Sequence, residues 1–243
     1  INTLYNGELK YSNGDTSDGA HAVRANFHAT INIGDGLTAG TLGESSHAVY
    51  AAQGRSTTNP TGGSKINIGK GAVLSTAGDG SHTVMMASNN GKIVIEEGAE
   101  MTTLGDGSHG VAAYADTSAK GSVANGAVEI GAGSTIATAG DGSHGVFANM
   151  TGSVLSLDDV GITTEGDASH GLLAQRGIIE AGDGLNISVE GSGSHGAYVN
   201  AATGSIEFLG GATIDNNDND GYAIYADKGT ITGTAGNSTF NIT

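Results

Sequence analysis

The chain has 243 residues, a formal net charge of −16 with only nine Lys and Arg residues, and no cysteine. This charge disfavours nucleic acid, heparin-like polyanions and anionic lipid surfaces as partners, and it favours basic protein surfaces. The absence of cysteine excludes disulfides and thiolate metal sites. No apolar run is long enough to cross a bilayer, so we expect no membrane insertion of this segment.

Glycine contributes 43 residues and proline only one, without the triplet period of collagen. The apolar residues alternate with polar ones over short stretches, and a helical period of 3.6 is missing. This composition is typical of ordered β-structure with many tight turns.

A repeated pentapeptide organises the chain. Gly-Asp-Gly-Ser-His ends at His82, His109 and His144, and variants of it end at His21, His47, His170 and His195. An eighth copy has Tyr222 in place of the histidine. The spacings along the chain are 26, 35, 27, 35, 26, 25 and 27 residues, so the period is close to 26 and two repeats carry about nine extra residues. A fixed period in the range of about 20–50 residues indicates a solenoid.

Each repeat contains three stretches with the period of a strand. The first has apolar residues two and four positions after the histidine, as in Val111 and Ala113. The second follows about ten residues later, as in Ile93/Ile95, and the third precedes the next pentapeptide, as in Ile136/Thr138. We therefore predict an all-β, right-handed parallel β-helix of about eight coils, with three short strands per coil of about 26 residues.

We expect residues 1–243 to form a single domain. The two long spacings place extra residues just after the first strand, at Gln53–Ser64 and Asp116–Gly126. These inserts are predicted to protrude as loops at the same corner, two coils apart.

The repeat histidines share one position of the coil, so they are predicted to form a structural column with rings pointing inward or along the corner. Metal binding is the alternative, but rings stacked side by side do not converge on one point as zinc ligands do. Burial of neutral rings would lower their pKa values, whereas pairing with acidic residues would raise them. The predicted column consists of His21, His47, His82, His109, His144, His170 and His195.

An acidic column lies three residues before the histidines. Like charges about 5 Å apart repel, so we expect the carboxylates to accept hydrogen bonds from their own turn backbone. Calcium is the alternative, although calcium-binding nonapeptide repeats have a period of nine rather than 26. The column comprises Asp18, Glu44, Asp79, Asp106, Asp141 and Asp167, continued by Ser192 and Asn219.

We predict no enzyme, cofactor or metal site. Ser, His and Asp are close together in every pentapeptide, but the serine occupies the opposite strand face from the histidine. β-Helix glycosidases need a pair of carboxylates on an exposed groove, and the sequence offers no such pair outside the repeated columns.

The residue between the two inward positions of the first strand varies from coil to coil and often is large and apolar. We expect this row to line one exposed sheet face, and large apolar and aromatic residues exposed in a row suggest a contact surface. The alternative is that each residue only covers neighbouring strands. The inserts add cations at the end of this face. The predicted partner-binding residues are Tyr50, Arg55, Met85, Lys120, Phe147, Leu173, Tyr198 and Tyr225.

The repeated T-x-G-D-G-S-H-G-V segments, such as Thr138–Val146, are followed by a strand of small residues and by a Gly-x-Ile-x-Ile turn and strand. These segments resemble the passenger domains of bacterial autotransporters, the type V secretion class, and the resemblance covers residues 14–243. The repeat is similar to that of autotransporters from Bartonella and related α-proteobacteria.

The resemblance implies a monomeric β-helix that is secreted or displayed on the outer-membrane surface and acts as a virulence factor. Its expected partner is a host cell-surface receptor or matrix protein, and a growth-factor-like, angiogenic agonist of endothelial cells is the narrower form of this expectation. An adhesin or a self-associating structural spacer without signalling is the alternative. A polysaccharide-active β-helix enzyme is less favoured.

Overall fold

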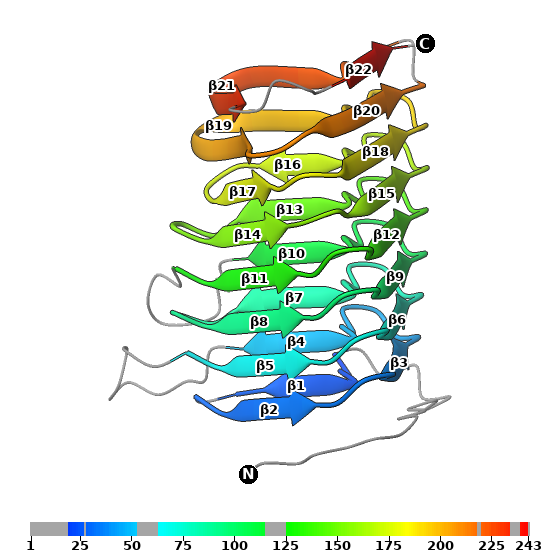
Figure 1. The fold of residues 1–243 in the computed structure, drawn as a ribbon. Helices are drawn as coiled ribbons and strands as arrows, with labels where there is room; N and C mark the ends of the chain where they lie inside the picture. Colours follow the sequence, from blue (N-terminus) through cyan, green and yellow to red (C-terminus); the bar gives the residue numbers. More distant parts are fainter. Residues whose placement is uncertain are drawn as a thin grey trace.

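The computed structural model describes residues 19–26, 28–52, 63–114, 125–217, 220–233 and 239–242. These residues contain the strands β1 to β22 and no helix (Figure 1). No long apolar helix that would cross a bilayer is therefore found in these ranges. The chain winds through coils stacked along one axis, and each coil contributes one strand to each of three columns (Figure 1).

The first strand of each coil begins two residues after the repeat histidine, as predicted. Its inner residues are mostly Val or Ala, with Met86 and Leu172 as larger members, which suits a narrow, buried parallel sheet. The separate first strands are β1 (Val23–Ala25), β4 (Val49–Ala52), β7 (Val84–Ala87), β10 (Val111–Tyr114), β13 (Val146–Asn149) and β16 (Leu172–Ala174).

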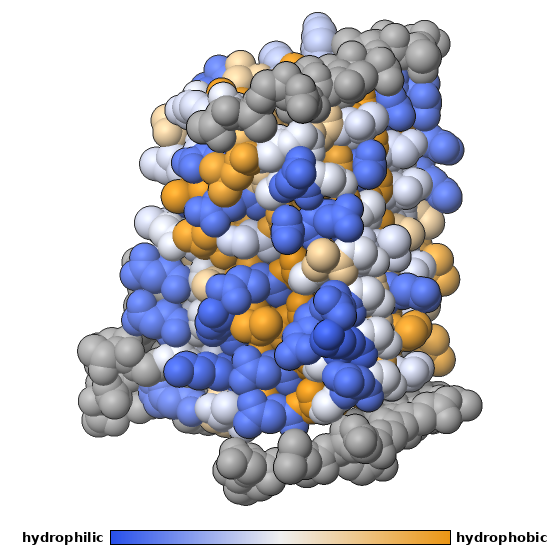
Figure 2. Space-filling view, in the orientation of Figure 1, coloured by the Kyte–Doolittle hydropathy of each residue, from blue (hydrophilic) through white to orange (hydrophobic). Residues whose placement is uncertain are grey.

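From β5 onward the separate second strands bury two apolar residues each, mostly Ile, Leu or Val, and leave the residue between them exposed or half-buried. The separate second strands are β2 (Thr30–Ile33), β5 (Lys65–Ile68), β8 (Lys92–Ile95), β11 (Ala127–Ile130), β14 (Val154–Leu157) and β17 (Ile178–Ala181). Figure 2 shows this face, on which hydrophilic residues gather over the lower coils around β2, β5 and β8.

In the last two coils the first and second strands run together as one long bent strand, which differs from the expected three short strands. β19 spans Ala197–Phe208 and β21 spans Ile224–Gly233, and their pairing register shifts between Val199 and Ser205. In earlier coils a corner turn separates the two strands. In these two coils the corner residues stay within the strand and appear as irregularities of the pairing register.

The third strands form a separate sheet in which equivalent strands also follow in coil order. These strands are β3 (Thr38–Thr41), β6 (Val73–Thr76), β9 (Glu100–Thr103), β12 (Thr135–Thr138), β15 (Gly161–Thr164), β18 (Leu185–Val189), β20 (Ala212–Asn216) and β22 (Thr239–Ile242).

Neighbouring coils pair in parallel and in the register that the repeat predicts. Val111, for example, lies beside Val84 on one side and Val146 on the other. The inward residues of the three columns form one continuous core in which Ile66, Ile93 and Leu155 are fully buried. Burial of each such side chain contributes about 1.5–3 kcal/mol. The core thus stabilises the stack along its whole length and fixes where each repeat position lies on the surface.

Candidate functional site

The seven repeat histidines form a column of stacked rings, as the sequence predicts. Centroids of successive rings are 4.7–5.0 Å apart and their planes differ by only 4–12°. The spacing follows the distance between parallel strands of about 4.8 Å. Stacking of the coils therefore determines the stacking of the rings.

Each ring is held by a backbone hydrogen bond from the following coil. The N–H of His47 donates to Nδ1 of His21, and the same bond recurs at every step until the N–H of Tyr222 donates to Nδ1 of His195. The seven donor–acceptor distances are 2.9–3.1 Å. An Nδ1 that accepts a hydrogen bond carries no proton, so the neutral rings carry their proton on Nε2.

This arrangement leaves the rings as hydrogen-bond donors rather than metal ligands. A metal would need a lone pair on Nδ1 or Nε2, but Nδ1 already accepts a backbone N–H and Nε2 is protonated. The same protonation state leaves no free nitrogen that would act as a general base. Within the described ranges, no group of three or more His, Cys, Asp or Glu residues is placed to hold a metal ion.

The rings lie on the outer side of the first sheet, so the inward orientation, one of the two predicted alternatives, is wrong. They contact the outward residue of the first strand: His109 meets Phe147 edge-on with centroids 4.7 Å apart, and His170 meets Tyr198 at 4.9 Å. The chain bends between the histidine and the strand, so the strict alternation of a strand does not extend back to the histidine.

The outward row of the first strands is mostly buried, so the expectation that it lines an exposed face is wrong. Met85, Phe147 and Leu173 are buried, and with Ala112 they form an apolar cluster separate from the main core. Tyr50, Tyr198 and Tyr225 are half-buried. The imidazole rings cover this row, so most of its apolar area is unavailable for a partner.

Two other predicted partner-binding residues, Arg55 and Lys120, lie outside the described residues. The same holds for most of the inserts that contain them, since only Gly63, Ser64, Asn125 and Gly126 at their ends are described. Their part in binding stays a prediction.

Burial lowers the pKa values of six column histidines, namely His21, His47, His82, His109, His144 and His170. Desolvation is the main cause throughout, and it lowers the pKa of His82 to about 3 and that of His144 to about 4. For His47 and His170 neighbouring imidazoles add to desolvation and the pKa falls to about 2. These six rings are therefore neutral at physiological pH, and carboxylate neighbours do not raise their pKa values.

Four carboxylates of the acidic column, those of Asp79, Asp106, Asp141 and Asp167, accept backbone N–H groups of the next coil, whereas bonds to their own turn had been predicted. Asp18 and Asn219 lie outside the described residues. Asp79 Oδ1 accepts the N–H of Asp106, and Asp106 Oδ1 accepts that of Asp141, both at 2.9 Å. The pattern continues through Asp141 and Asp167. One oxygen of each carboxylate thus holds the next coil in register.

The serines form a third column, which runs in the opposite direction. Ser108 is fully buried, its Oγ accepts the N–H of Ser81 at 2.9 Å, and the same Oγ donates to the carbonyl of Gly78 at 3.0 Å. Ser81 and Ser143 are bound in the same way. The Ser, His and Asp of each pentapeptide therefore have separate structural partners and do not form a triad.

A groove interrupts the outer surface of the histidine column, and the sequence did not reveal it. Its volume is about 310 Å³, and among the described residues no charged side chain lines it. We call it the imidazole groove; it is lined by Ser45, His47, Gly80, His82, Met85, Gly107, His109 and Tyr114.

The local cause of the imidazole groove is a small residue in the outward row. Ala112 pairs with Met85 and Phe147 in register, so one coil lacks the large side chain that its neighbours have. The ring of Tyr114, two residues on, packs against Phe147 with centroids 5.3 Å apart and lies parallel to the His82 and His109 rings at 6.2 and 6.5 Å. The signal in the sequence was the alanine itself within a row of large residues.

A second groove of about 270 Å³ lies on the second sheet, lined among others by Glu129, Glu180, Asp158 and Leu209. Ser156 lies between the two glutamates in the ladder and donates to Glu180 Oε2 at 2.8 Å. Two coil steps therefore separate Glu129 from Glu180.

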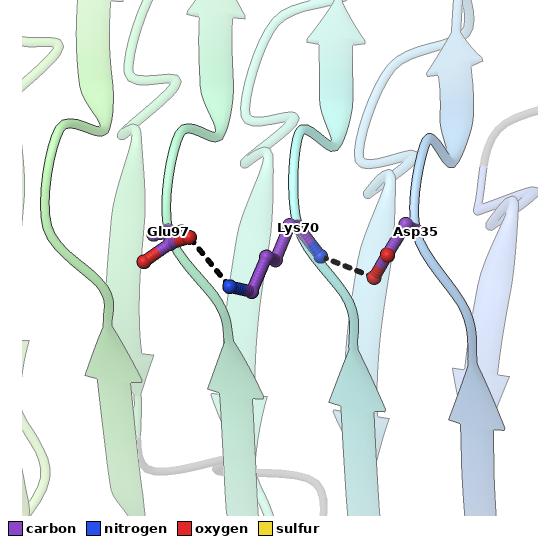
Figure 3. A network of polar contacts seen from close by, with 3 residues as sticks. All are labelled: Asp35, Lys70 and Glu97. Atoms are coloured by element: carbon purple, nitrogen blue, oxygen red, sulfur yellow. Dashed lines mark hydrogen bonds and ion pairs between the residues drawn. The ribbon is translucent and has the colours of Figure 1, made fainter.

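The turn between second and third strands contains a further polar network (Figure 3). Asp35 accepts the backbone N–H of Lys70 at 2.9 Å, while the Lys70 ammonium donates to Glu97 at 2.6 Å. The hydrogen bond and charge of Glu97 raise the pKa of Lys70. All three residues belong to exposed turns of successive coils, so the network links coils at the surface.

Comparison of the chain with family models, with curated proteins and with solved structures finds no match to any of them.

Proposed function

We propose that this chain is an extracellular binding protein of the autotransporter passenger type, which contacts a host cell-surface receptor or matrix protein through the imidazole groove. The observation that carries the proposal is the groove itself, because it lies where the repeat is broken at Ala112. In a solenoid the regular positions maintain the stack, and residues that depart from the repeat are free to serve recognition.

Binding is favoured over catalysis by the way the reactive side chains are used. The histidine Nδ1, the serine Oγ and one carboxylate oxygen of the repeated aspartates each bind backbone groups of a neighbouring coil. A nucleophile and its base must instead contact each other.

Charge narrows the class of partner. With a net charge of −16 and a pI near 4.5, the chain attracts proteins with a basic surface and repels polyanions. The groove lining itself is uncharged, so charge would guide the encounter while the groove provides the specific contact.

The proposal is tested with two tyrosine truncations in strands of the same sheet, Tyr114 in β10 and Tyr198 in β19. Tyr114→Ala removes a wall of the imidazole groove, whereas Tyr198→Ala removes a half-buried tyrosine three coils away, outside the groove. We expect Tyr114→Ala to weaken binding to endothelial or epithelial cells at least tenfold, equivalent to about 1.4 kcal/mol, and Tyr198→Ala to leave it unchanged.

Equal binding by both variants and the unmodified chain would refute the proposed role of the groove. Receptor phosphorylation in the same cells separates the two forms of the proposal. Activation that is lost with Tyr114→Ala supports an agonist, and binding without activation supports an adhesin.

A further inference from the structure

The three histidines of the imidazole groove present hydrogen-bond donors to a ligand. The faces of the His47, His82 and His109 rings are covered by stacking, and their Nδ1 atoms are taken by backbone N–H groups. In the described part of the chain, the buried side-chain polar atoms without a partner belong to His28 and Asn149, so the Nε2 atoms of the groove histidines are not among them. The Nε2–H groups of the three groove histidines therefore reach the surface, in a row along the groove.

The backbone N–H groups of the turn wall are not free to bind a ligand, and the Ser45 hydroxyl, which can donate or accept, is the polar side chain of this wall. The N–H groups of Gly80, Gly107 and Ser45 donate to backbone carbonyls of neighbouring coils at 2.8–2.9 Å. A ligand must consequently offer acceptors to the Nε2–H row, because a donor left unpaired on burial costs about 1–3 kcal/mol.

The remaining lining is apolar and suits a flat ring. Met85 contributes a thioether, which makes favourable contacts with aromatic rings, and Tyr114 contributes an aromatic wall. Rings pair with aromatic walls in offset or edge-on geometry. The groove volume of about 310 Å³ accommodates a single aromatic side chain.

Charge excludes an anionic ligand. Each of the turn residues Ser45, Gly80 and Gly107 directly follows an acidic residue of the column, namely Glu44, Asp79 and Asp106. A carboxylate or phosphate would accept from the imidazoles but would meet repulsion from this row. The ligand is therefore a neutral ring that carries an acceptor.

We propose that the imidazole groove binds an exposed tyrosine side chain of the partner protein, with the phenol oxygen accepting from Nε2–H of His82 or His109. Phenylalanine would leave these donors unpaired, and the indole of tryptophan has a donor but no acceptor. This assignment rests on the proposed function and specifies the partner group that the groove recognises.

The test uses small probes and the intact chain at pH 7.5, where the rings are neutral. NMR follows the side-chain resonances of the histidines during titration with p-cresol, toluene and p-toluate. We expect p-cresol to shift the His82 and His109 resonances saturably. Toluene, which lacks the acceptor, should bind about three- to tenfold more weakly, and anionic p-toluate should bind more weakly than p-cresol.

Tyr114→Ala should abolish p-cresol binding, while Tyr198→Ala should preserve it. Equal affinity for p-cresol and toluene, no saturable shift, or equal effects of the two variants would overturn the assignment. If the probes fail but Tyr114→Ala still loses cell binding, the proposed function stands and the tyrosine assignment falls. If neither assay responds to Tyr114→Ala, both fall.

Discussion

Lowering the pH from 7.5 to 5.5 should destabilise the protein strongly, because protons bind the unfolded histidines and not the folded ones. In the fold each Nδ1 accepts a backbone N–H. A proton on Nδ1 would remove this acceptor and place two hydrogen-bond donors, Nδ1–H and the backbone N–H, against each other. The folded pKa values of the column lie at about 2 to 4 where they are defined, below the value of about 6.5 for an unfolded histidine.

The sign and size of the effect follow from linkage. The contribution of the column to stability is complete above pH 6.5 and is lost progressively as the pH falls from there toward the folded pKa values. At pH 5.5 each buried ring has lost about 1.4 kcal/mol. His47, His82, His109 and His170 are each only 6–8% exposed, so these four alone account for about 5 kcal/mol.

A loss of this size is comparable with the whole free energy of unfolding of many domains, about 5–15 kcal/mol. For a chain of this length it corresponds to a fall in melting temperature of roughly 10–20 °C. Carboxylates remain ionised at pH 5.5, since their unfolded pKa values are near 4, and the change therefore reports on histidine.

Thermal melts followed by circular dichroism at constant ionic strength measure the effect, and His82→Asn provides the control. Asparagine offers an oxygen acceptor for the His109 N–H but does not titrate near neutral pH. The variant should be less stable at pH 7.5, because ring stacking is lost. Below pH 6 the free energy of unfolding of the variant should fall less steeply with pH than that of the unmodified chain, by about 1.4 kcal/mol per pH unit. A melting temperature that stays constant or rises at pH 5.5 would refute the reasoning.

Three further predictions concern other positions. Asp106→Ala, which removes the acceptor for the Asp141 N–H, should lower the free energy of unfolding in urea by about 1 kcal/mol, whereas Asp106→Asn should have a smaller effect. Gly145→Ala should cost about 1–3 kcal/mol, because the added methyl carbon would lie 2.3 Å from Ile162 Cγ2; a wild-type urea midpoint would contradict this packing. Lys70→Gln breaks an exposed ion pair with Glu97 and should leave the melting temperature unchanged, so a clear fall would show that the surface network matters.

The sequence was sufficient for the architecture because each strand position recurs at a fixed offset from a histidine. The pairing of Val111 with Val84 and Val146 follows directly from that offset. Ring stacking was predictable for the same reason, since side chains at one position of a parallel stack must repeat at the strand spacing.

The orientation of the rings was not predictable from parity, because the chain bends at the residue after each histidine, as at Gly110. Extending the alternation across that bend placed the rings on the wrong side of the sheet. It also made Phe147 and Leu173 look exposed, although the rings cover them. The contribution of Tyr114 to the groove depends on how its ring folds back toward Phe147, which no repeat position specifies.

The hydrogen bonds between neighbouring coils have a consequence for how the molecule folds and how its length can change. Each column histidine accepts a backbone N–H from the following coil, and each buried serine oxygen accepts one from the preceding coil. A single coil in isolation would leave the histidine and serine acceptors without these N–H donors. Folding must therefore propagate from a coil that is already formed to the next one. Duplication or loss of one whole coil keeps every such hydrogen bond formed, and evolution can thereby change the length of the rod without redesigning its interior.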